Sequence, residues 1–365
     1  MALRSAAAAI APALLRVMLV EDSAVVRGVM SRWIAAEPGF SVVGAAGDGR
    51  EALDLVDALR PDIVLLDLEM PVLDGLSALP QLLARRPGLS VIVVSTLTRR
   101  NAGLTLACMA AGAVECLTKP EMRRDPSSLA GFRDELLRKL RGLAPRHLAR
   151  QAPPLAIPSP PPRMRPAALP AIRPRAIGIG ASTGGPTALV ELLRDLAAAN
   201  RLVPILVVQH MPELFTAVFA DQLRAKTGLA IAEGRDGEPL RPGRIYIAPG
   251  GRHMGIASPD GTPAIRLDGG PPVNHCRPAV DVLFADLARI YGPASLGIVL
   301  TGMGHDGTDG AEALGRAAAR VFVQDEATSV IWGMPGSIAR AGLATQVLPL
   351  DRLGKAVSEA LGLPC

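Results

Sequence analysis

The stretch IGIGASTGGP, residues 177–186, decides how the second half of the chain is interpreted. An apolar segment typical of a buried strand runs directly into glycines and small polar residues. Pro186 follows, and proline is favoured in the first turn of a helix. A glycine-rich turn between a strand and a helix either holds a phosphate group or exposes a nucleophilic serine. The two interpretations predict a nucleotide-binding module or a hydrolase.

The phosphate interpretation fails on spacing. The dinucleotide-binding fingerprint is G-x-G-x-x-G. If it begins at Gly178, Gly180 fits the second glycine, but Thr183 stands where the third glycine is required and Gly184 comes one residue too late. A P-loop needs a lysine before its serine or threonine, and no lysine is near. About 20 residues further on, where a ribose-binding acid belongs, the sequence has the helical tract LAAAN. The stretch is therefore not favoured as a nucleotide site.

The hydrolase interpretation gains support from two later strand ends. Residues 180–184 fit the pattern G-x-S-x-G, with small neighbours that let the chain turn sharply around Ser182. A serine needs a base and a group that orients the base. His210 follows the apolar run PILVVQ, and Asp306 follows the run LGIVLTG. Strand ends in a parallel sheet share one edge, so Ser182, His210 and Asp306 are predicted to form a catalytic triad.

The other histidines are weaker candidates for the base. His305 directly precedes Asp306, and adjacent side chains on extended backbone point to opposite sides, so both should not face the serine. His253 and His275 are expected to be structural or to lie in the substrate site. The chain order Ser, His, Asp differs from that of α/β-hydrolases, which excludes that family but not the mechanism.

Both halves of the chain alternate apolar strands with helical stretches, which predicts an α/β fold with parallel sheets covered on both faces. In the N-terminal half the expected strands are residues 16–22, 40–46, 62–67, 90–95 and 114–118, with a helix starting at Ser23. In the C-terminal half they are residues 176–182, 204–210, 243–250, 296–302, 320–326 and 345–350.

A proline-rich segment separates the halves. Nine of the 25 residues from Gln151 to Arg175 are proline, and none is acidic, so an extended linker is expected. Twelve basic and four acidic residues lie between Glu121 and Arg175, whereas the rest of the chain has 27 basic and 30 acidic residues. The basic charge thus belongs to the linker region, and nucleic-acid binding by the folded parts is not expected.

Cysteine content and hydropathy set the expected compartment. The four cysteines form no C-x-x-C pair, which is typical of a reducing cytosol and argues against a structural zinc site. No run of 18 apolar residues occurs, so no membrane span is expected. The alanine-rich residues 1–15 are interpreted as a short extension rather than a signal peptide. A cytoplasmic location is predicted.

Polar residues also end the strands of the N-terminal half. Glu21 and Asp22 follow the first strand and Asp67 ends the third, and three carboxylates on one edge suit a divalent cation such as Mg²⁺. Ser95 ends the fourth strand and Lys119 follows the fifth. A carboxylate beside a metal, an ammonium group and a hydroxyl is well placed to accept a phosphoryl group.

These residues closely resemble the receiver domain of bacterial two-component response regulators over residues 16–140. The resemblance implies a flavodoxin-like fold with a five-stranded parallel sheet. It assigns Asp67 as phosphoacceptor, Glu21, Asp22 and Asp67 as Mg²⁺ ligands, and Ser95 and Lys119 as the switch pair. Cys116 departs from the pattern, because receivers commonly carry an aromatic switch residue three positions before the lysine.

The C-terminal half closely resembles the catalytic domain of the chemotaxis protein-glutamate methylesterases, the CheB family. The motifs that carry the resemblance are GASTGGP, QHMPELFTAVFADQL, APGGRHM, PPVNHCRPAVDVLF, TGMGHDG and QDEATSVIWGMPG, in that order. The resemblance implies that Ser182 is the nucleophile, His210 the base and Asp306 its orienting carboxylate. The backbone N–H groups of Thr183 and Met303 would form the oxyanion hole, and the esterase step would use no cofactor.

The expected organisation is an extension over residues 1–15, a receiver domain over 16–140, a linker over 141–172 and a doubly wound α/β methylesterase domain over 173–362. The resemblance implies demethylation and glutamine deamidation of methylated chemoreceptors, with only peripheral membrane contact. It also implies phosphorylation by the chemotaxis histidine kinase, which would relieve inhibition by the receiver. Two alternatives remain open: another methylated protein as substrate, or a response regulator with a non-enzymatic binding domain.

Overall fold

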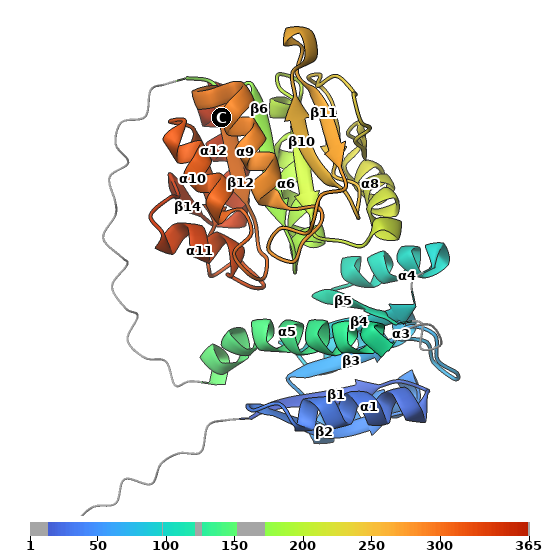
Figure 1. Ribbon diagram of the computed structural model, residues 1–365. Helices are drawn as coiled ribbons and strands as arrows, with labels where there is room; N and C mark the ends of the chain where they lie inside the picture. Colours follow the sequence, from blue (N-terminus) through green and yellow to red (C-terminus); the bar gives the residue numbers. More distant parts are fainter. Residues whose placement is uncertain (1–13, 97, 121–125, 152–171, 364–365) are drawn as a thin grey trace, which may run out of the picture. The chain divides into compact units, whose positions relative to one another are not determined.

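A computed structural model describes residues 14–96, 98–120, 126–151 and 172–363. It contains two α/β units, one built on the sheet formed by β1–β5 and one on a larger sheet that begins with β6 (Figure 1). Most of the expected N-terminal extension and of the proline-rich linker lies outside the described residues. Within them, no helix has both the length and the apolar character needed to cross a membrane.

The first unit contains a five-stranded sheet in the order β2-β1-β3-β4-β5, with parallel pairing of β1 with β2 and β3, and of β3 with β4. Its strands are β1 Leu15–Val20, β2 Phe40–Ala46, β3 Ile63–Asp67, β4 Ser90–Thr96 and β5 Glu115–Lys119. The central strands β1, β3 and β4 are almost entirely buried, as expected from their continuous apolar runs. The expected flavodoxin-like sheet is confirmed.

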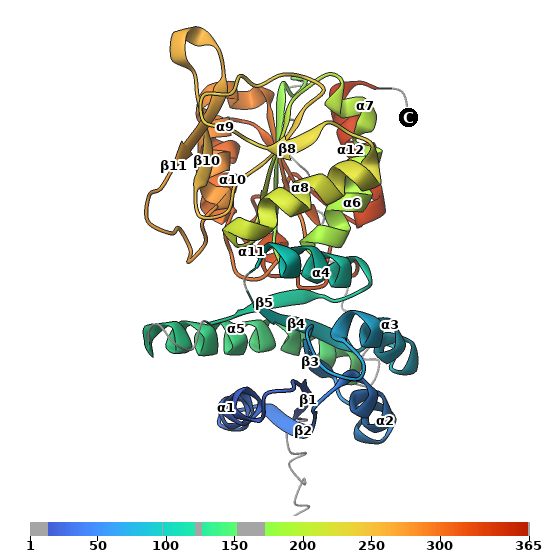
Figure 2. The ribbon, with the colours of Figure 1, turned by 90° about the vertical axis from the view of Figure 1, so that its right-hand side faces the viewer.

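Helices follow the strands of this part of the chain: α1 Ala24–Ala35, α2 Gly49–Leu59, α3 Gly75–Arg85, α4 Arg99–Ala110 and α5 Pro126–Gln151. The expected helix start at Ser23 holds, since its hydroxyl accepts a hydrogen bond from the N–H of Val26 and so caps α1. Figure 2 shows α1 and α5 on one face of the sheet and α2 and α3 on the other. Helix α5 continues to Gln151, into the segment assigned to the linker.

The second unit contains a seven-stranded sheet in the order β14-β13-β12-β6-β7-β9-β8, and every pair with a defined register is parallel. Its strands are β6 Ala176–Ala181, β7 Ile205–Gln209, β8 Ile231–Glu233, β9 Ile245–Ile247, β12 Ser295–Val299, β13 Arg320–Gln324 and β14 Gln346–Leu348. The chain builds outward from β6 on one side and then returns to place β12 on the other. Ligand sites of open α/β sheets lie at such a switch point, beyond the carboxyl ends of the strands.

Helices cover both faces of the larger sheet, as expected for a doubly wound fold (Figure 2). On one face lie α6 Gly185–Asp195, α7 Ala197–Asn200, α8 Glu213–Thr227 and α12 Leu350–Leu361. On the other lie α9 Val280–Tyr291, α10 Thr308–Arg316 and α11 Met334–Arg340. Side chains of β6 alternate between the two cores, with Ile177 and Ile179 facing the α6 side.

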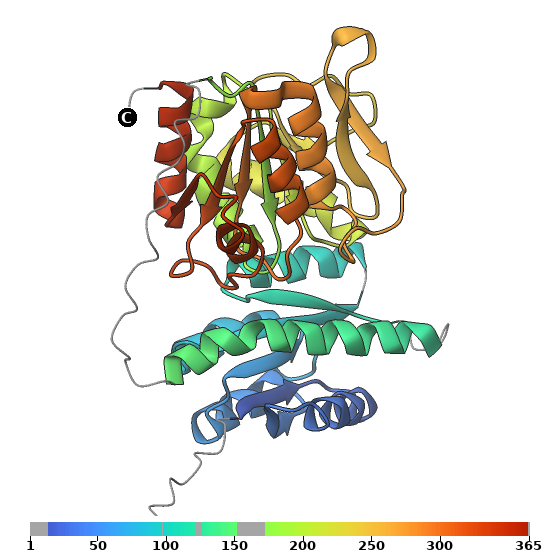
Figure 3. The same cartoon turned by 60° about the vertical axis from the view of Figure 1, so that its left-hand side comes forward.

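The sequence interpretation missed the edge strand β8 of the main sheet and a separate hairpin. Strands β10 His253–Ala257 and β11 Ala264–Asp268 form an antiparallel hairpin outside the main sheet. Figure 3 shows the hairpin projecting beside α9, in the golden part of the ribbon. The expected strand at residues 243–250 is also shorter, because β9 ends at Ile247. The hairpin leads directly into the loop that carries the motif PPVNHC, residues 271–276.

Candidate active site

Two groups of charged side chains lie at strand ends, one in each unit. In the first unit, Glu21 follows β1, Asp67 ends β3 and Lys119 ends β5. The Nζ atom of Lys119 is 2.7 Å from Oε2 of Glu21 and 2.7 Å from Oδ2 of Asp67. Carboxylate oxygens of Glu21, Asp22 and Asp67 all lie within 4.8 Å of one another. Three oxygen donors so close together fit a hard divalent cation such as Mg²⁺.

Burial dominates the electrostatics of this cluster. It raises the pKa of both Glu21 and Asp67, and the ion pairs with Lys119 offset this only in part. Burial also works against the charged form of Lys119, but its ion pairs with Asp67 and Glu21 raise its pKa overall. Ser95, near the end of β4, is buried. Cys116, at the usual aromatic position, is half-buried within β5.

The glycines of the opening stretch serve close packing rather than phosphate binding. A Cβ atom at Gly178 would lie 2.3 Å from Cδ1 of Leu287, and one at Gly180 would lie 2.6 Å from the Val280 methyl carbons, so both glycines let α9 approach β6. Gly184 has φ +77°, which side chains rarely adopt, and its Cβ would meet Val330. The chain therefore turns sharply after Ser182 and enters α6 through Gly184.

His210 and Asp306 meet directly. The Nε2 atom of His210 lies 2.7 Å from Oδ2 of Asp306. Asp306 is almost fully buried and also accepts backbone hydrogen bonds from Val280, Asp281 and Gly307 at 2.6, 3.2 and 3.0 Å. A carboxylate held by three N–H groups is fixed in position and kept ionised, and can orient an imidazole.

Each member of this pair stabilises the charged form of the other. Burial opposes the imidazolium form of His210, but the hydrogen bond to Asp306, together with the neighbouring sulfur of Cys276, raises the pKa of His210 above its ordinary value. Burial likewise acts to raise the pKa of Asp306, but the hydrogen bond to His210 lowers it overall. Neighbouring Asp281 is different, because burial together with the nearby charge of Asp306 raises its pKa to about 7.

The backbone around Ser182 is bonded to the neighbouring strand ends. Its N–H donates to the carbonyl of Thr301 at 3.1 Å, and the N–H of His210 donates to the carbonyl of Ala181 at 3.0 Å. Among the described residues, the Ser182 hydroxyl makes no hydrogen bond of its own. The structure thus places all three predicted residues at one edge of the sheet, with contact between His210 and Asp306 and an unpaired hydroxyl on Ser182.

Gln209 is a functional candidate that sequence reasoning missed. Its buried side chain donates from Nε2 to the carbonyl of Ser182 at 2.9 Å and to that of His210 at 3.2 Å. One amide group therefore joins the backbones of two candidate catalytic residues. The available signal was its position, directly before His210 at the end of an apolar strand.

The expected oxyanion residues each adjoin Ser182 or a residue that packs against it. Thr183 follows Ser182 in the chain and is buried. Met303 follows Gly302, which packs so closely that a Cβ there would lie 2.9 Å from Cβ of Ser182. Gly302 itself is fixed by bonds from its N–H to Ile331 and from the N–H of Met334 to its carbonyl.

The three histidines weighed as weaker candidates differ in burial. His305 is exposed while its neighbour Asp306 is buried, so the two side chains differ in direction. His275 is also exposed. His253 is almost fully buried, and its Nε2 atom lies 3.0 Å from the carbonyl oxygen of Pro271.

Cys276 also touches the imidazole. Its sulfur lies 3.5 Å from Nδ1 of His210, on the nitrogen that Asp306 does not use. Nothing in the spacing of the cysteines pointed to this contact. The only available signal was the presence of Cys276 inside one of the family motifs.

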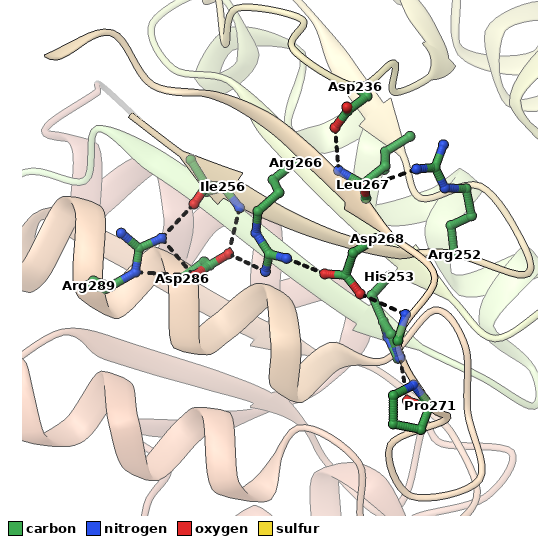
Figure 4. Close-up of polar contacts among 11 residues, drawn as sticks. Asp236, Arg252, His253, Ile256, Arg266, Leu267, Asp268, Pro271, Asp286 and Arg289 are labelled. Carbon is green, nitrogen blue, oxygen red and sulfur yellow. Dashed lines mark hydrogen bonds and ion pairs between the residues drawn. The ribbon is translucent and has the colours of Figure 1, made fainter. Parts of the chain in front are cut away.

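A polar network anchors the loop that carries Cys276 (Figure 4). Asp286 of α9 accepts hydrogen bonds from Arg266 at 3.0 Å and from the backbone N–H of Ile256 at 2.8 Å, which fixes the hairpin to the helix. Asp268 at the end of β11 pairs with Arg266 and accepts the N–H of Gly270 at 3.0 Å. The base of the loop is therefore held to the rest of the second unit.

Comparisons with known proteins show which family the chain belongs to. A model of the CheB methylesterase domain matches residues 177–357, and one of the response regulator receiver domain matches residues 17–127. A protein-glutamate methylesterase/protein-glutamine glutaminase of a group 2 operon from Rhodopseudomonas palustris is 43% identical over 364 residues, covering 94% of this chain and 93% of the relative. The chain belongs to the CheB methylesterase family.

Other members of the CheB family give the same result. A protein-glutamate methylesterase/protein-glutamine glutaminase 2 from Caulobacter vibrioides is 47% identical and covers 93% of this chain and 97% of the relative. The crystal structure of the CheB methylesterase catalytic domain of Thermotoga maritima has 38% identity and a TM-score of 0.50, covering 52% of this chain and 99% of that chain. The expected class, a CheB methylesterase with a receiver domain, is confirmed.

Proposed function

We propose that this chain is a phosphorylation-activated serine esterase that removes methyl esters from glutamate side chains of chemoreceptors. The observation that carries the proposal is the His210–Asp306 pair, joined at 2.7 Å, with the backbone N–H of His210 bonded to Ala181, the residue before Ser182. The same site would deamidate receptor glutamines, because its relatives are named as protein-glutamine glutaminases as well as methylesterases. We place the receiver domain at residues 16–140, the linker at 141–172 and the catalytic domain at 173–362.

The geometry supports a separate catalytic role for each of these residues. His210 donates its Nε2 proton to Asp306, so Nδ1 holds the lone pair that can accept the proton of Ser182. The serine oxygen then attacks the γ-carbonyl carbon of the methylated glutamate. Backbone N–H groups of Thr183 and Met303 would stabilise the resulting oxyanion, a contribution of about 3–4 kcal/mol for one donor. Asp306 keeps the imidazolium oriented throughout.

The second half of the reaction reuses the same groups. The imidazolium returns its proton to the leaving oxygen, methanol departs and an acyl-serine remains. Water, deprotonated by His210, then attacks the acyl carbon and releases the glutamate side chain with its free carboxylate. When the substrate is a glutamine side chain, ammonia leaves in place of methanol and the rest of the sequence is unchanged.

The first unit would supply the control. Receiver domains in general are phosphorylated in a Mg²⁺-dependent reaction. Here Asp67 would accept the phosphoryl group from the chemotaxis histidine kinase. Glu21, Asp22 and Asp67 would hold Mg²⁺, which neutralises charge on the transferring group. Lys119 and Ser95 would bind the phosphoryl oxygens, and Cys116 would replace the usual aromatic switch residue.

The test measures methanol release from membranes that contain methylated chemoreceptors. Wild type, Ser182→Ala and Asp67→Ala are compared, each with and without acetyl phosphate and Mg²⁺. We expect release to be lost in Ser182→Ala, and the phosphodonor to stimulate wild type but not Asp67→Ala. Undiminished release by Ser182→Ala would contradict the triad. No release by phosphorylated wild type would favour a different methylated substrate or a binding role.

A further inference from the structure

The contact between Cys276 and His210 lies on the nitrogen that the proposed mechanism needs. Because Nε2 donates to Asp306 at 2.7 Å, the neutral ring carries its lone pair on Nδ1. The sulfur of Cys276 is 3.5 Å from that nitrogen and is half-buried. Its S–H group can therefore donate to the same lone pair that would accept the proton of Ser182.

The position of Cys276 is fixed by its own turn. Val273 and Cys276 exchange backbone hydrogen bonds of 3.0 and 2.8 Å, and the two residues between them, Asn274 and His275, have φ values of 50° and 62°. The Asn274 amide donates to Asp281 at 2.7 Å and reaches Asp306 at 3.4 Å. Asp306 thus contacts both the imidazole and the turn that presents the thiol.

A thiol beside an imidazole that a carboxylate orients has the composition of a cysteine-based catalytic triad. Transfer of the thiol proton to Nδ1 gives a thiolate and an imidazolium, and Asp306 stabilises the imidazolium. The thiolate is the reactive form of cysteine. In contrast, Cys108 is completely buried in α4. The arrangement around Cys276 combines partial exposure with an adjacent base.

We propose that Cys276 is a modification site, at which a hydroperoxide oxidises a thiol activated by His210 and thereby stops the esterase. The proposal rests on the proposed roles of Ser182 and His210. The thiolate sulfur attacks one peroxide oxygen, the S–O bond forms and the O–O bond breaks. Sulfur is oxidised to a sulfenic acid, the peroxide is reduced, and the departing hydroxide or alkoxide takes the imidazolium proton to leave as water or an alcohol.

Inhibition follows from the place of the new oxygen. A sulfenic acid at Cys276 carries its hydroxyl against Nδ1, so the nitrogen is engaged by a hydrogen bond that Ser182 has to displace. A small thiol reverses the step by forming a mixed disulfide and water, and a second thiol then releases Cys276. The modification would be reversible and would act on the base rather than on the nucleophile.

The first experiment measures thiol reactivity, which needs no esterase turnover. The full-length chain is treated with iodoacetamide at pH 7, and alkylation of the Cys276 peptide is followed by mass spectrometry. We expect His210→Gln and Asp306→Asn to slow alkylation of Cys276 by roughly tenfold or more, because each loses the stabilised imidazolium. His305→Gln, a change to the exposed neighbour, is the matched control and should react like wild type.

Equal alkylation rates in wild type, His210→Gln and Asp306→Asn would overturn the activation of the thiol. Thermal melts of each variant identify any unfolding, which would speed alkylation rather than slow it. Asp306→Asn keeps the size of the side chain and so provides a second measurement if His210→Gln does not fold.

The second experiment measures control of the enzyme by peroxide. After treatment with hydrogen peroxide, wild type should lose most of its methanol release, give a dimedone adduct at Cys276 and recover with dithiothreitol. Cys276→Ser should release methanol after peroxide treatment as fast as the same variant does without treatment. Equal inactivation of Cys276→Ser would overturn the proposal. Ser182→Ala should still give the adduct, so failure of the serine mechanism and failure of the thiol proposal can be told apart.

Discussion

The imidazole of His210 and the carboxylate of Asp306 lie 96 positions apart in the chain, yet their Nε2 and Oδ2 atoms are separated by 2.7 Å. Three backbone N–H groups hold Asp306 in place, so the carboxylate is a fixed charge rather than a mobile one. This pair controls the protonation of the base, and the first prediction follows from it.

Asp306→Asn should shift the pH dependence of kcat/KM. Burial lowers the pKa of His210, but the hydrogen bond to Asp306, together with the contact with Cys276, raises it overall, and the base works only when it is neutral. In wild type the acid limb therefore lies above the ordinary histidine pKa of about 6.5. Asp306→Asn should move that limb to lower pH and reduce the maximal rate by roughly 10⁴. The pH profile of methanol release measures both.

Asp309→Asn is the matched control for this prediction, because Asp309 is exposed in the first turn of α10. Its profile should follow wild type. An acid limb that stays in place in Asp306→Asn would show that His210 is not the group that titrates.

Gln209→Leu should slow the reaction with little effect on substrate binding. The amide of Gln209 joins the carbonyls of Ser182 and His210, and leucine leaves both partly buried acceptors without that donor. We expect kcat to fall by roughly tenfold or more with KM changed less than about twofold, and the free energy of unfolding to drop by about 1–3 kcal/mol. Gln346→Leu, at an exposed position of β14, is the control. An unchanged kcat in Gln209→Leu would exclude the positioning role.

Lys119→Met should destabilise the first unit, and more so as the pH rises. Folding raises the pKa of both Glu21 and Asp67. Each carboxyl therefore makes the folded protein less stable as the pH increases above the pKa that the group has in the unfolded chain, near 4. Lys119 offsets part of that cost, and its removal leaves two buried charges unpaired. We expect a loss of about 3–5 kcal/mol near neutral pH and a smaller loss at acid pH, measured by urea unfolding.

Addition of Mg²⁺ should recover part of the stability of Lys119→Met, since the cation would take the place of the ammonium charge. Lys355→Met, which removes an exposed lysine 4.0 Å from Glu359, should change stability by less than about 0.5 kcal/mol. A loss in Lys119→Met that is independent of pH would show that packing, rather than charge, is responsible.

Gly184→Ala should destabilise the second unit. Gly184 has φ +77°, and an added Cβ would lie 2.6 Å from a methyl carbon of Val330. We expect a loss of about 1–3 kcal/mol in the free energy of unfolding, together with lower activity because the turn after Ser182 is displaced. Gly315→Ala is the control: it lies in α10 with open space around it and should gain about 0.5–1 kcal/mol. Equal effects of the two changes on thermal unfolding would contradict the strain argument.

The sequence by itself determined that the chain forms two parallel sheets, most of their strands and the residues at the strand ends. Apolar runs separated by helices can be buried only in covered parallel sheets, and the carboxyl ends of such strands share one edge. That rule was enough to predict that Glu21, Asp67 and Lys119 share one sheet edge, and that Ser182, His210 and Asp306 share another.

Only the tertiary structure decided which ring nitrogen of His210 contacts Asp306, and only the structure shows that the sulfur of Cys276 contacts the other nitrogen. Spacing along the chain could not reveal the contact, because it depends on two left-handed residues, Asn274 and His275, that aim the turn. The antiparallel hairpin β10–β11 and the double hydrogen bond of Gln209 were hidden for the same reason. Periodicity reports which face of an element is buried, whereas side-chain direction in loops depends on contacts between distant residues.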